Sequence, residues 1–308
     1  MYAKLIKIEQ IMTKSIKSGK YDVFSLVFFV HTVFVHIFFF TNFVCQSTMT
    51  NKAFQILSWL RHALTATNTH GHGIHSPRLF NIVQNVIDNP YPYYIYKDIE
   101  RYRKVLEQNN STINVTDLGT GQSGPRTISH IARTSLADKK QAQLLNKIAA
   151  EIKPDVIVEL GTSLGLTTAY LAAADSRTKV LSLEGCPNIS EIARKTLDTL
   201  HISNASIIVG DISNTLDTAL DDIESIGLLY IDANHTAAAL EEYFDKCAKK
   251  MSGQAIAVVD DIYWSEDMNK GWRQLTHHPK VTTSFDLYNC GMLFFDTNLP
   301  HRTYRIRL

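Results

Sequence analysis

The chain has 308 residues, of which 45% are hydrophobic and 20% charged, a composition typical of a globular protein with one large domain and an appendage. Its formal net charge of +1 gives no strong signal for nucleic acid, which requires a basic surface. The cysteines form no CxxC pair, which argues against a disulfide framework and a zinc knuckle and indicates a reducing compartment. They are Cys45, Cys186, Cys247 and Cys290.

The first 48 residues contain an uncharged apolar run at 23–44, about long enough to cross a bilayer, which needs roughly 20 residues. Two interpretations stay open. In the one that we favour, residues 1–48 are an upstream stretch wrongly included, translation begins at Met49 and the protein is cytoplasmic. In the other, residues 23–44 are a membrane anchor, with its N-terminus kept inside by preceding lysines. These are Lys4, Lys7, Lys14, Lys17 and Lys20.

Residues 49–153 are expected to form helices and loops that act as a cap or as an oligomerisation region, including a homodimer contact. Ser76 and Pro77 are typical of a helix N-cap and first helical position, which we favour over a metal site at the nearby His70, His72 and His75. The opening segment predicts an amphipathic helix, because its larger side chains recur at helical spacing. These are Phe54, Leu57, Leu60, Arg61 and Leu64.

From residue 154 to 308 the sequence alternates between short apolar runs and helical patterns. The runs are DVIVEL, KVLSLE, ASIIVG, IGLLYID and QAIAVVD. Strand, helix and strand at this spacing predict a parallel sheet with right-handed crossovers, and the tail VTTSFDLYNCGMLFFD predicts an antiparallel hairpin. The expected fold class is therefore α/β, with a Rossmann-like, doubly wound, mostly parallel sheet of seven strands after a helical N-terminal region.

Two glycine-rich loops compete for the role of a cofactor loop. The first, INVTDLGTGQSGPRT, has a short strand and a proline, and we expect Gly119–Gly124 to be a surface loop, or at most a lid or substrate loop. The second, DVIVELGTSLGLTTAYLAAA, follows a buried strand and opens a helix, so that its backbone amides can meet an anionic group. The second loop is therefore predicted to bind the cofactor.

The acids after the next two strands indicate which cofactor is bound. The spacing of Gly161 and Gly165 departs from the GxGxxG of a dinucleotide site. Glu184 can accept both hydroxyls of a ribose, and Asp211 can accept an exocyclic amine or, alternatively, cap a helix. Together these groups favour S-adenosylmethionine. The expected cofactor residues are Glu159, Gly161, Thr162, Ser163, Gly165, Glu184, Gly185, Asp211, Ile212 and Asp232.

These motifs resemble those of class I S-adenosylmethionine-dependent methyltransferases, specifically the group that includes catechol and caffeoyl-CoA O-methyltransferases. VELGTSLGLTTAYLA resembles motif I, LEGCP the ribose acid, and YIDANH and VVDDIYW the ends of the fourth and fifth strands. The layout from HGIHSP to DDIYWSEDM also resembles an uncharacterised bacterial subgroup, which implies no substrate. The resemblance implies O-methylation of a small hydroxylated molecule.

Three aspartates at the ends of adjacent strands suit a hard cation such as Mg²⁺ or another divalent ion. The resemblance implies the same ligands at Asp232, Asp260 and Asp261, although Asp261 replaces an asparagine of the relatives. His235 stands where these relatives have a lysine that acts as base, so His235 and Asp232 are the expected catalytic residues. Alternatively, the carboxylates cap strand ends and contact only the cofactor.

Two other functions stay open. Methylation of an RNA base needs a basic surface, which the near-neutral charge does not supply. A non-catalytic, membrane-anchored binding module with a vestigial cofactor site requires that residues 23–44 be present in the mature protein.

Overall fold

The structure is a computed structural model that describes residues 50–116 and 121–308. The expectations for residues 1–48, and for the part of the first glycine loop at 117–120, fall outside the described residues. Among the helices that the structure describes, none is long and apolar enough to cross a membrane.

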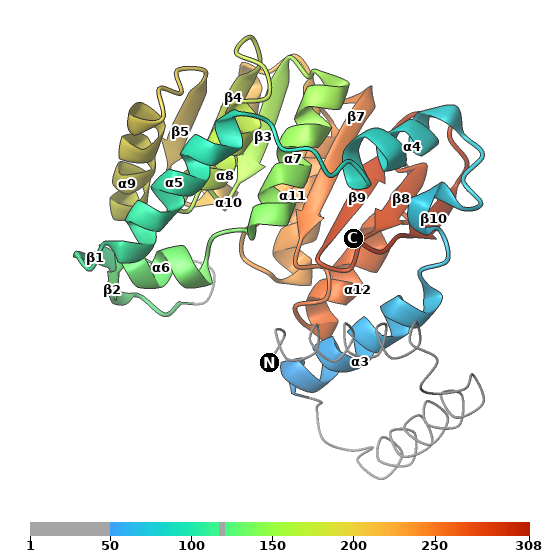
Figure 1. The fold of residues 1–308 in the computed structure, drawn as a ribbon, viewed down its shortest axis with the longest axis horizontal. Coiled ribbons are helices and arrows are strands. Elements are labelled where there is room, and N and C mark those ends of the chain that lie inside the picture. The colour runs from blue at the N-terminus through green and yellow to red at the C-terminus, as the bar shows by residue number, and fades with distance from the viewer. Residues whose placement is uncertain (1–49, 117–120) are drawn as a thin grey trace. The chain divides into compact units, whose positions relative to one another are not determined.

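Residues Asn51–Leu308 form one compact unit around a central sheet, and the predicted boundary at 153/154 lies inside it. The sheet has the order β10-β8-β9-β7-β6-β3-β4-β5 (Figure 1). The strands β7, β6, β3, β4 and β5 are parallel to one another, and β9 is antiparallel to both of its neighbours. The predicted Rossmann-like fold class is confirmed. The strands are β3 Val156–Leu160, β4 Lys179–Glu184, β5 Ala205–Val209, β6 Ile226–Ile231, β7 Met251–Asp260, β8 Thr283–Asp286, β9 Cys290–Phe294 and β10 Arg302–Arg305.

Helices cover both faces of the sheet, as expected of parallel strands that read as continuous apolar runs. On one face Leu216, Phe244 and Trp272 pack against strand residues such as Leu229. These three side chains come from α10 Ile212–Asp221, α11 Ala237–Ala248 and α12 Glu266–Leu275. The helices associated with the other face are α4 Pro77–Ile82, η2 Val83–Ile87, α5 Ile95–Gln108, α6 Ile128–Thr134, α7 Lys139–Ile152, α8 Leu166–Ala172 and α9 Pro187–Thr199.

The region before β3 is mainly helical, as predicted, and it begins with α3 Asn51–Thr65 and the short η1 Thr69–Gly71. Ser76 caps α4 and Pro77 opens it, which confirms that interpretation of the histidine-rich segment. The first glycine loop joins two antiparallel strands, β1 Thr112–Val115 and β2 Gly124–Thr127, rather than a strand and a helix.

Two features correct the sequence-based expectations. The region between residues 49 and 153 contains the β1–β2 hairpin as well as helices. The main sheet has eight described strands instead of seven, because β10 adds itself in parallel to β8. The segment escaped prediction because it is short and charged, and because Tyr304 is its one fully buried side chain.

Candidate active site

The loop that follows β3 turns sharply because two glycines adopt backbone conformations that other residues avoid. Gly161 has a φ of +103°, and a Cβ at this position would lie 2.1 Å from the carbonyl oxygen of Asp232. Gly165 has a φ of +80°, and a Cβ there would lie 3.0 Å from the carbonyl oxygen of Ala193. The loop therefore requires both glycines, and it lies directly against the residue that follows β6.

Glu184, at the end of β4, is held beside the same loop. One of its carboxylate oxygens accepts a hydrogen bond from the Ser163 amide at 2.9 Å. The other accepts one from the Cys186 amide, also at 2.9 Å, across the turn that contains Gly185. The two bonds orient the carboxylate, so the structure brings together the two main elements of the predicted cofactor site.

Two buried polar atoms near this loop lack a hydrogen-bond partner among the described residues: Oε1 of Glu159 and Oγ of Ser163. Glu159 is fully buried in β3, where the hydroxyls of Thr168 and Ser182 both donate to its other oxygen. Thr162 shares a further hydrogen bond with Ser182. Buried polar groups in folded proteins are nearly always paired, so these two atoms indicate a polar ligand.

Burial raises the pKa of Glu159 to about 7, although hydrogen bonds from Ser182 and Thr168 act in the opposite direction. A buried carboxyl group in this state is stabilised in its ionised form by a neighbouring cation.

Asp211 and Ile212 form the start of α10. The Asp211 side chain accepts a hydrogen bond from the Ser213 amide at 3.0 Å, so it caps the helix. Its expected contact with an exocyclic amine stays a prediction.

Three aspartates lie at the ends of the neighbouring strands β6 and β7: Asp232 follows β6, Asp260 ends β7 and Asp261 comes directly after it. The hydroxyl of Tyr230 lies between two of them, 2.7 Å from Oδ2 of Asp260 and 3.3 Å from Oδ2 of Asp232. The Gln141 side chain, from α7, and the backbone amide of Asp261 both donate to Oδ1 of Asp260. Asp260 is thus surrounded by protein donors.

The pKa values of all three aspartates are raised. For Asp232 the main cause is burial, followed by the charges of Asp260 and Asp261. Burial and the Asp260 charge raise the pKa of Asp261 to about 7. For Asp260, burial outweighs its hydrogen bonds to Tyr230 and Gln141, which lower the pKa. Burial and mutual repulsion therefore oppose the simultaneous ionisation of all three carboxyl groups.

The cation expected at Asp232, Asp260 and Asp261 stays a prediction. Within residues 50–116 and 121–308, no group of three or more His, Cys, Asp or Glu side chains converges on a metal position. Both oxygens of Asp260 already accept hydrogen bonds. We therefore assign no chemical step to a metal.

His235 lies at the edge of the aspartate cluster, with its Nε2 atom 3.8 Å from Oδ1 of Asp232. Burial lowers its pKa, against an opposing effect of Asp260, so the imidazole is neutral at neutral pH. Its Nδ1 atom is buried without a partner in the described part of the chain. The centroid of the ring is 5.9 Å from that of Trp264, whose side chain is large and 48% exposed.

Two residues that shape this site, Tyr230 and Gln141, were not predicted from the sequence. Tyr230 precedes Asp232 by two positions and therefore shares its side of β6, a period-two signal that could have identified it. Gln141 comes from a separate helix, and its segment contains no pattern that connects it with Asp260.

Comparison with known proteins supports the resemblance to methyltransferases. Residues 158–262 match the family model described as a methyltransferase domain. No curated protein matches the chain. A proposed O-methyltransferase from Klebsiella pneumoniae has 12% sequence identity and a TM-score of 0.50, over 69% of this chain and 94% of that one. The O-methyltransferase from Bacillus cereus in complex with SAH has 14% identity and a TM-score of 0.50, over 68% and 96%.

At such identities the structural likeness concerns the fold, and the matched segment runs from β3 to the residues just after β7. That segment contains the glycine loop, Glu184 and the three aspartates. The predicted resemblance is thus confirmed: residues 158–262 match a methyltransferase-domain model, and the chain shares its fold with solved O-methyltransferases.

Proposed function

We propose that this protein is an S-adenosylmethionine-dependent O-methyltransferase that acts on a small hydroxylated molecule. The observation that carries the proposal is the polar cradle after β3. There the glycine loop, the oriented carboxylate of Glu184 and the unpartnered Oε1 of Glu159 lie together. A ligand with a ribose and a cationic group would satisfy both carboxylates.

Each end of the cofactor has an expected partner in this chain. Glu184 would accept the ribose hydroxyls, and Glu159 would face the ammonium group, with Ser163 as a neighbouring polar contact. Asp211 and Ile212 would lie at the adenine end. When bound, S-adenosylmethionine supplies an activated methyl group, whose transfer to oxygen releases S-adenosylhomocysteine and one proton.

The protein's chemical task is to orient the acceptor hydroxyl and to take up that proton. His235 is suited to this role because burial lowers its pKa and keeps the ring neutral at neutral pH. Asp232, 3.8 Å away, would stabilise the protonated ring. Trp264 would form an apolar wall that positions the acceptor and displaces water from it.

Calorimetric titration of the full chain with S-adenosylhomocysteine tests the cofactor half of this proposal. We expect Glu184→Gln to weaken binding by about tenfold or more, because it replaces a carboxylate that would bind both ribose hydroxyls. Glu191→Gln is the matched control, since Glu191 is an exposed acid paired with Lys195 on α9. The control should bind like the wild type.

Two results would count against the proposal. If the wild type releases no heat with S-adenosylhomocysteine, the fold is a binding module without its cofactor. If Glu184→Gln binds as tightly as Glu191→Gln, the ribose assignment is wrong. The titration is repeated with added Mg²⁺. We expect the same affinity for S-adenosylhomocysteine, and a large gain in that affinity would support a cation at the three aspartates.

A further inference from the structure

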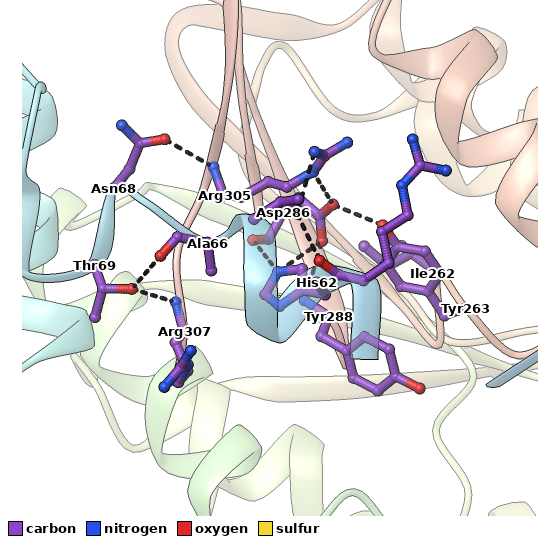
Figure 2. A network of polar contacts seen from close by, with 12 residues as sticks. His62, Ala66, Asn68, Thr69, Ile262, Tyr263, Asp286, Tyr288, Arg305 and Arg307 are labelled. Carbon is purple, nitrogen blue, oxygen red and sulfur yellow. Dashed lines mark hydrogen bonds and ion pairs between the residues drawn. The ribbon is translucent and has the colours of Figure 1, made fainter. Parts of the chain in front are cut away.

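Helix α3 is anchored next to the proposed acceptor site by residues far away in the sequence. The anchor is His62, which is almost completely buried against β8. Its Nε2 atom donates to the carbonyl oxygen of Asp286 at 3.0 Å and lies 3.3 Å from Oδ1 of the same residue. Figure 2 shows Asp286 at the centre of this network, with Tyr263 and Arg305 also directed toward it.

The same network reaches the loop at 261–265, which we call the acceptor loop. Tyr263, in this loop, donates its hydroxyl to Oδ2 of Asp286 at 2.8 Å. Its ring stacks on Tyr288, with a centroid distance of 5.0 Å and an interplanar angle of 15°. Asp286 thus joins α3 to the acceptor loop, and the two tyrosines form a platform between them.

Two turns earlier in α3, Gln55 contacts both the acceptor loop and one tyrosine of this platform. Its side-chain amide donates to the carbonyl oxygen of Trp264 at 2.8 Å. Its backbone carbonyl accepts the hydroxyl of Tyr288 at 2.7 Å. Phe54 adds an aromatic contact with Tyr263, at 6.4 Å between ring centroids. Gln55 and His62 differ by seven positions, so both lie on the same face of the helix.

We propose that α3 is the outer support of the acceptor site, and that Gln55 is a positioning residue that holds Trp264 beside His235. This inference rests on the proposed function, because it assigns Trp264 to the acceptor wall. The acceptor loop has its own turn, in which the Trp264 amide donates to the Asp261 carbonyl. The Trp264 carbonyl, in contrast, is tied down from α3.

The contacts described for the cofactor cradle come from a different part of the chain. Glu184 and Glu159 are held by contacts with Ser163, Cys186, Thr168 and Ser182, all of which lie between β3 and the start of α9. A substitution that weakens the contacts of α3 should therefore change the position of Trp264 and the binding of the acceptor, and leave cofactor binding unchanged. This separation makes the proposal testable.

The test replaces Gln55 by methionine, which keeps the length of the side chain and the helix propensity but removes the amide donor. Gln84→Met is the matched control, because the Gln84 amide also donates to a backbone carbonyl, that of His70, in a different part of the molecule. Acrylamide quenching measures the accessibility of Trp264. Its signal is isolated by subtracting the fluorescence of the same protein with Trp264→Phe.

We expect Gln55→Met to raise the quenching constant of Trp264 about twofold and the KM for catechol, used as a hydroxylated probe, about fivefold, the effect of one lost hydrogen bond. Affinity for S-adenosylhomocysteine should stay within about twofold. Gln84→Met should change none of these quantities. Gln55→Asn, which keeps the amide but is shorter, should give an intermediate quenching constant.

The proposal is overturned if Trp264 quenching is the same in Gln55→Met and the wild type, or if Gln84→Met changes it equally. It is also overturned if cofactor affinity falls as much as the affinity for catechol, since α3 would then support the whole domain. A wild type that binds no S-adenosylhomocysteine, or does not methylate catechol, counts against the proposed function or its acceptor class. The quenching comparison then decides on the α3 support alone.

Discussion

Two buried aspartates at the ends of strands, Asp286 of β8 and Asp260 of β7, differ in the direction of their pKa shift. Both are almost inaccessible, with 3% and 7% of their surface exposed. The pKa of Asp286 is lowered, whereas that of Asp260 is raised. Burial alone raises the pKa of a carboxyl group, so the difference comes from the neighbours.

Asp286 has partners that compensate its charge. Burial pushes its pKa up, but the hydrogen bond and charge of His62, together with the hydroxyl of Tyr263 and the backbone amide of Tyr288, outweigh that effect. Asp260 has neutral donors and lies near other carboxylates. The environment of Asp286, with compensating partners, is that of a structural anchor. The environment of Asp260 is unfavourable for stability and is typical of functional sites, where groups are held for a ligand.

The largest expected effect comes from removing the anchor. We expect Asp286→Ala to lower the free energy of unfolding by about 3 kcal/mol, because it leaves the buried groups of His62 and Tyr263 without their partner. Urea denaturation at pH 7 measures this change. Asp245→Ala, which removes an exposed partner of His278, is the control and should cost far less. Equal losses in the two variants would show that Asp286 is no anchor.

At the candidate active site, removal of an aspartate charge is expected to raise the free energy of unfolding, by a smaller amount. Asp260→Asn should raise the free energy of unfolding at pH 7 by roughly 1 kcal/mol, because it removes one charge from a cluster of like charges. Asp286→Asn, the same substitution in the other environment, should lower it. Urea denaturation of both variants gives the comparison directly. A destabilised Asp260→Asn protein would mean that its hydrogen bonds outweigh the repulsion.

The remaining prediction concerns the pH dependence of stability in the ligand-free protein. The pKa of Glu159 rises from an ordinary value of 4.5 to about 7, and that of Asp261 from 3.8 to about 7. The folded state then binds more protons than the unfolded state between these values, so stability should fall as pH rises from about 4 to 7. Thermal unfolding across this range tests the sign.

The opposite sign holds in acid. The lowered pKa of Asp286 stabilises the fold above its ordinary value of 3.8, and this contribution is lost as pH falls through the lower, folded-state value. In Asp286→Asn, the loss of stability at acid pH should be smaller than in the wild type. A stability that rises steadily from pH 4 to 7 in the wild type would contradict the assignment of raised pKa values at the site.

The opening helix illustrates a limit of prediction from sequence. The helical spacing of Phe54, Leu57 and Leu64 predicts a helix, and α3 spans these positions. Yet Leu64 is 59% exposed, and the buried residue of this helix is His62. The contacts described for this helix include a polar and aromatic network, and the partners in that network come from β8 and the acceptor loop.

The sequence by itself determined the five parallel strands, the glycine loop and the acid at the end of β4. These signals are local, because a buried parallel strand is a run of apolar residues and a tight turn requires glycine within a few positions. Only the tertiary structure decided the partners of the buried carboxylates. Gln141 and Asp260 are 119 positions apart, and His62 and Asp286 are 224 apart. A hydrogen bond between two such side chains leaves no periodic pattern in either segment, so only the packing of the elements reveals it.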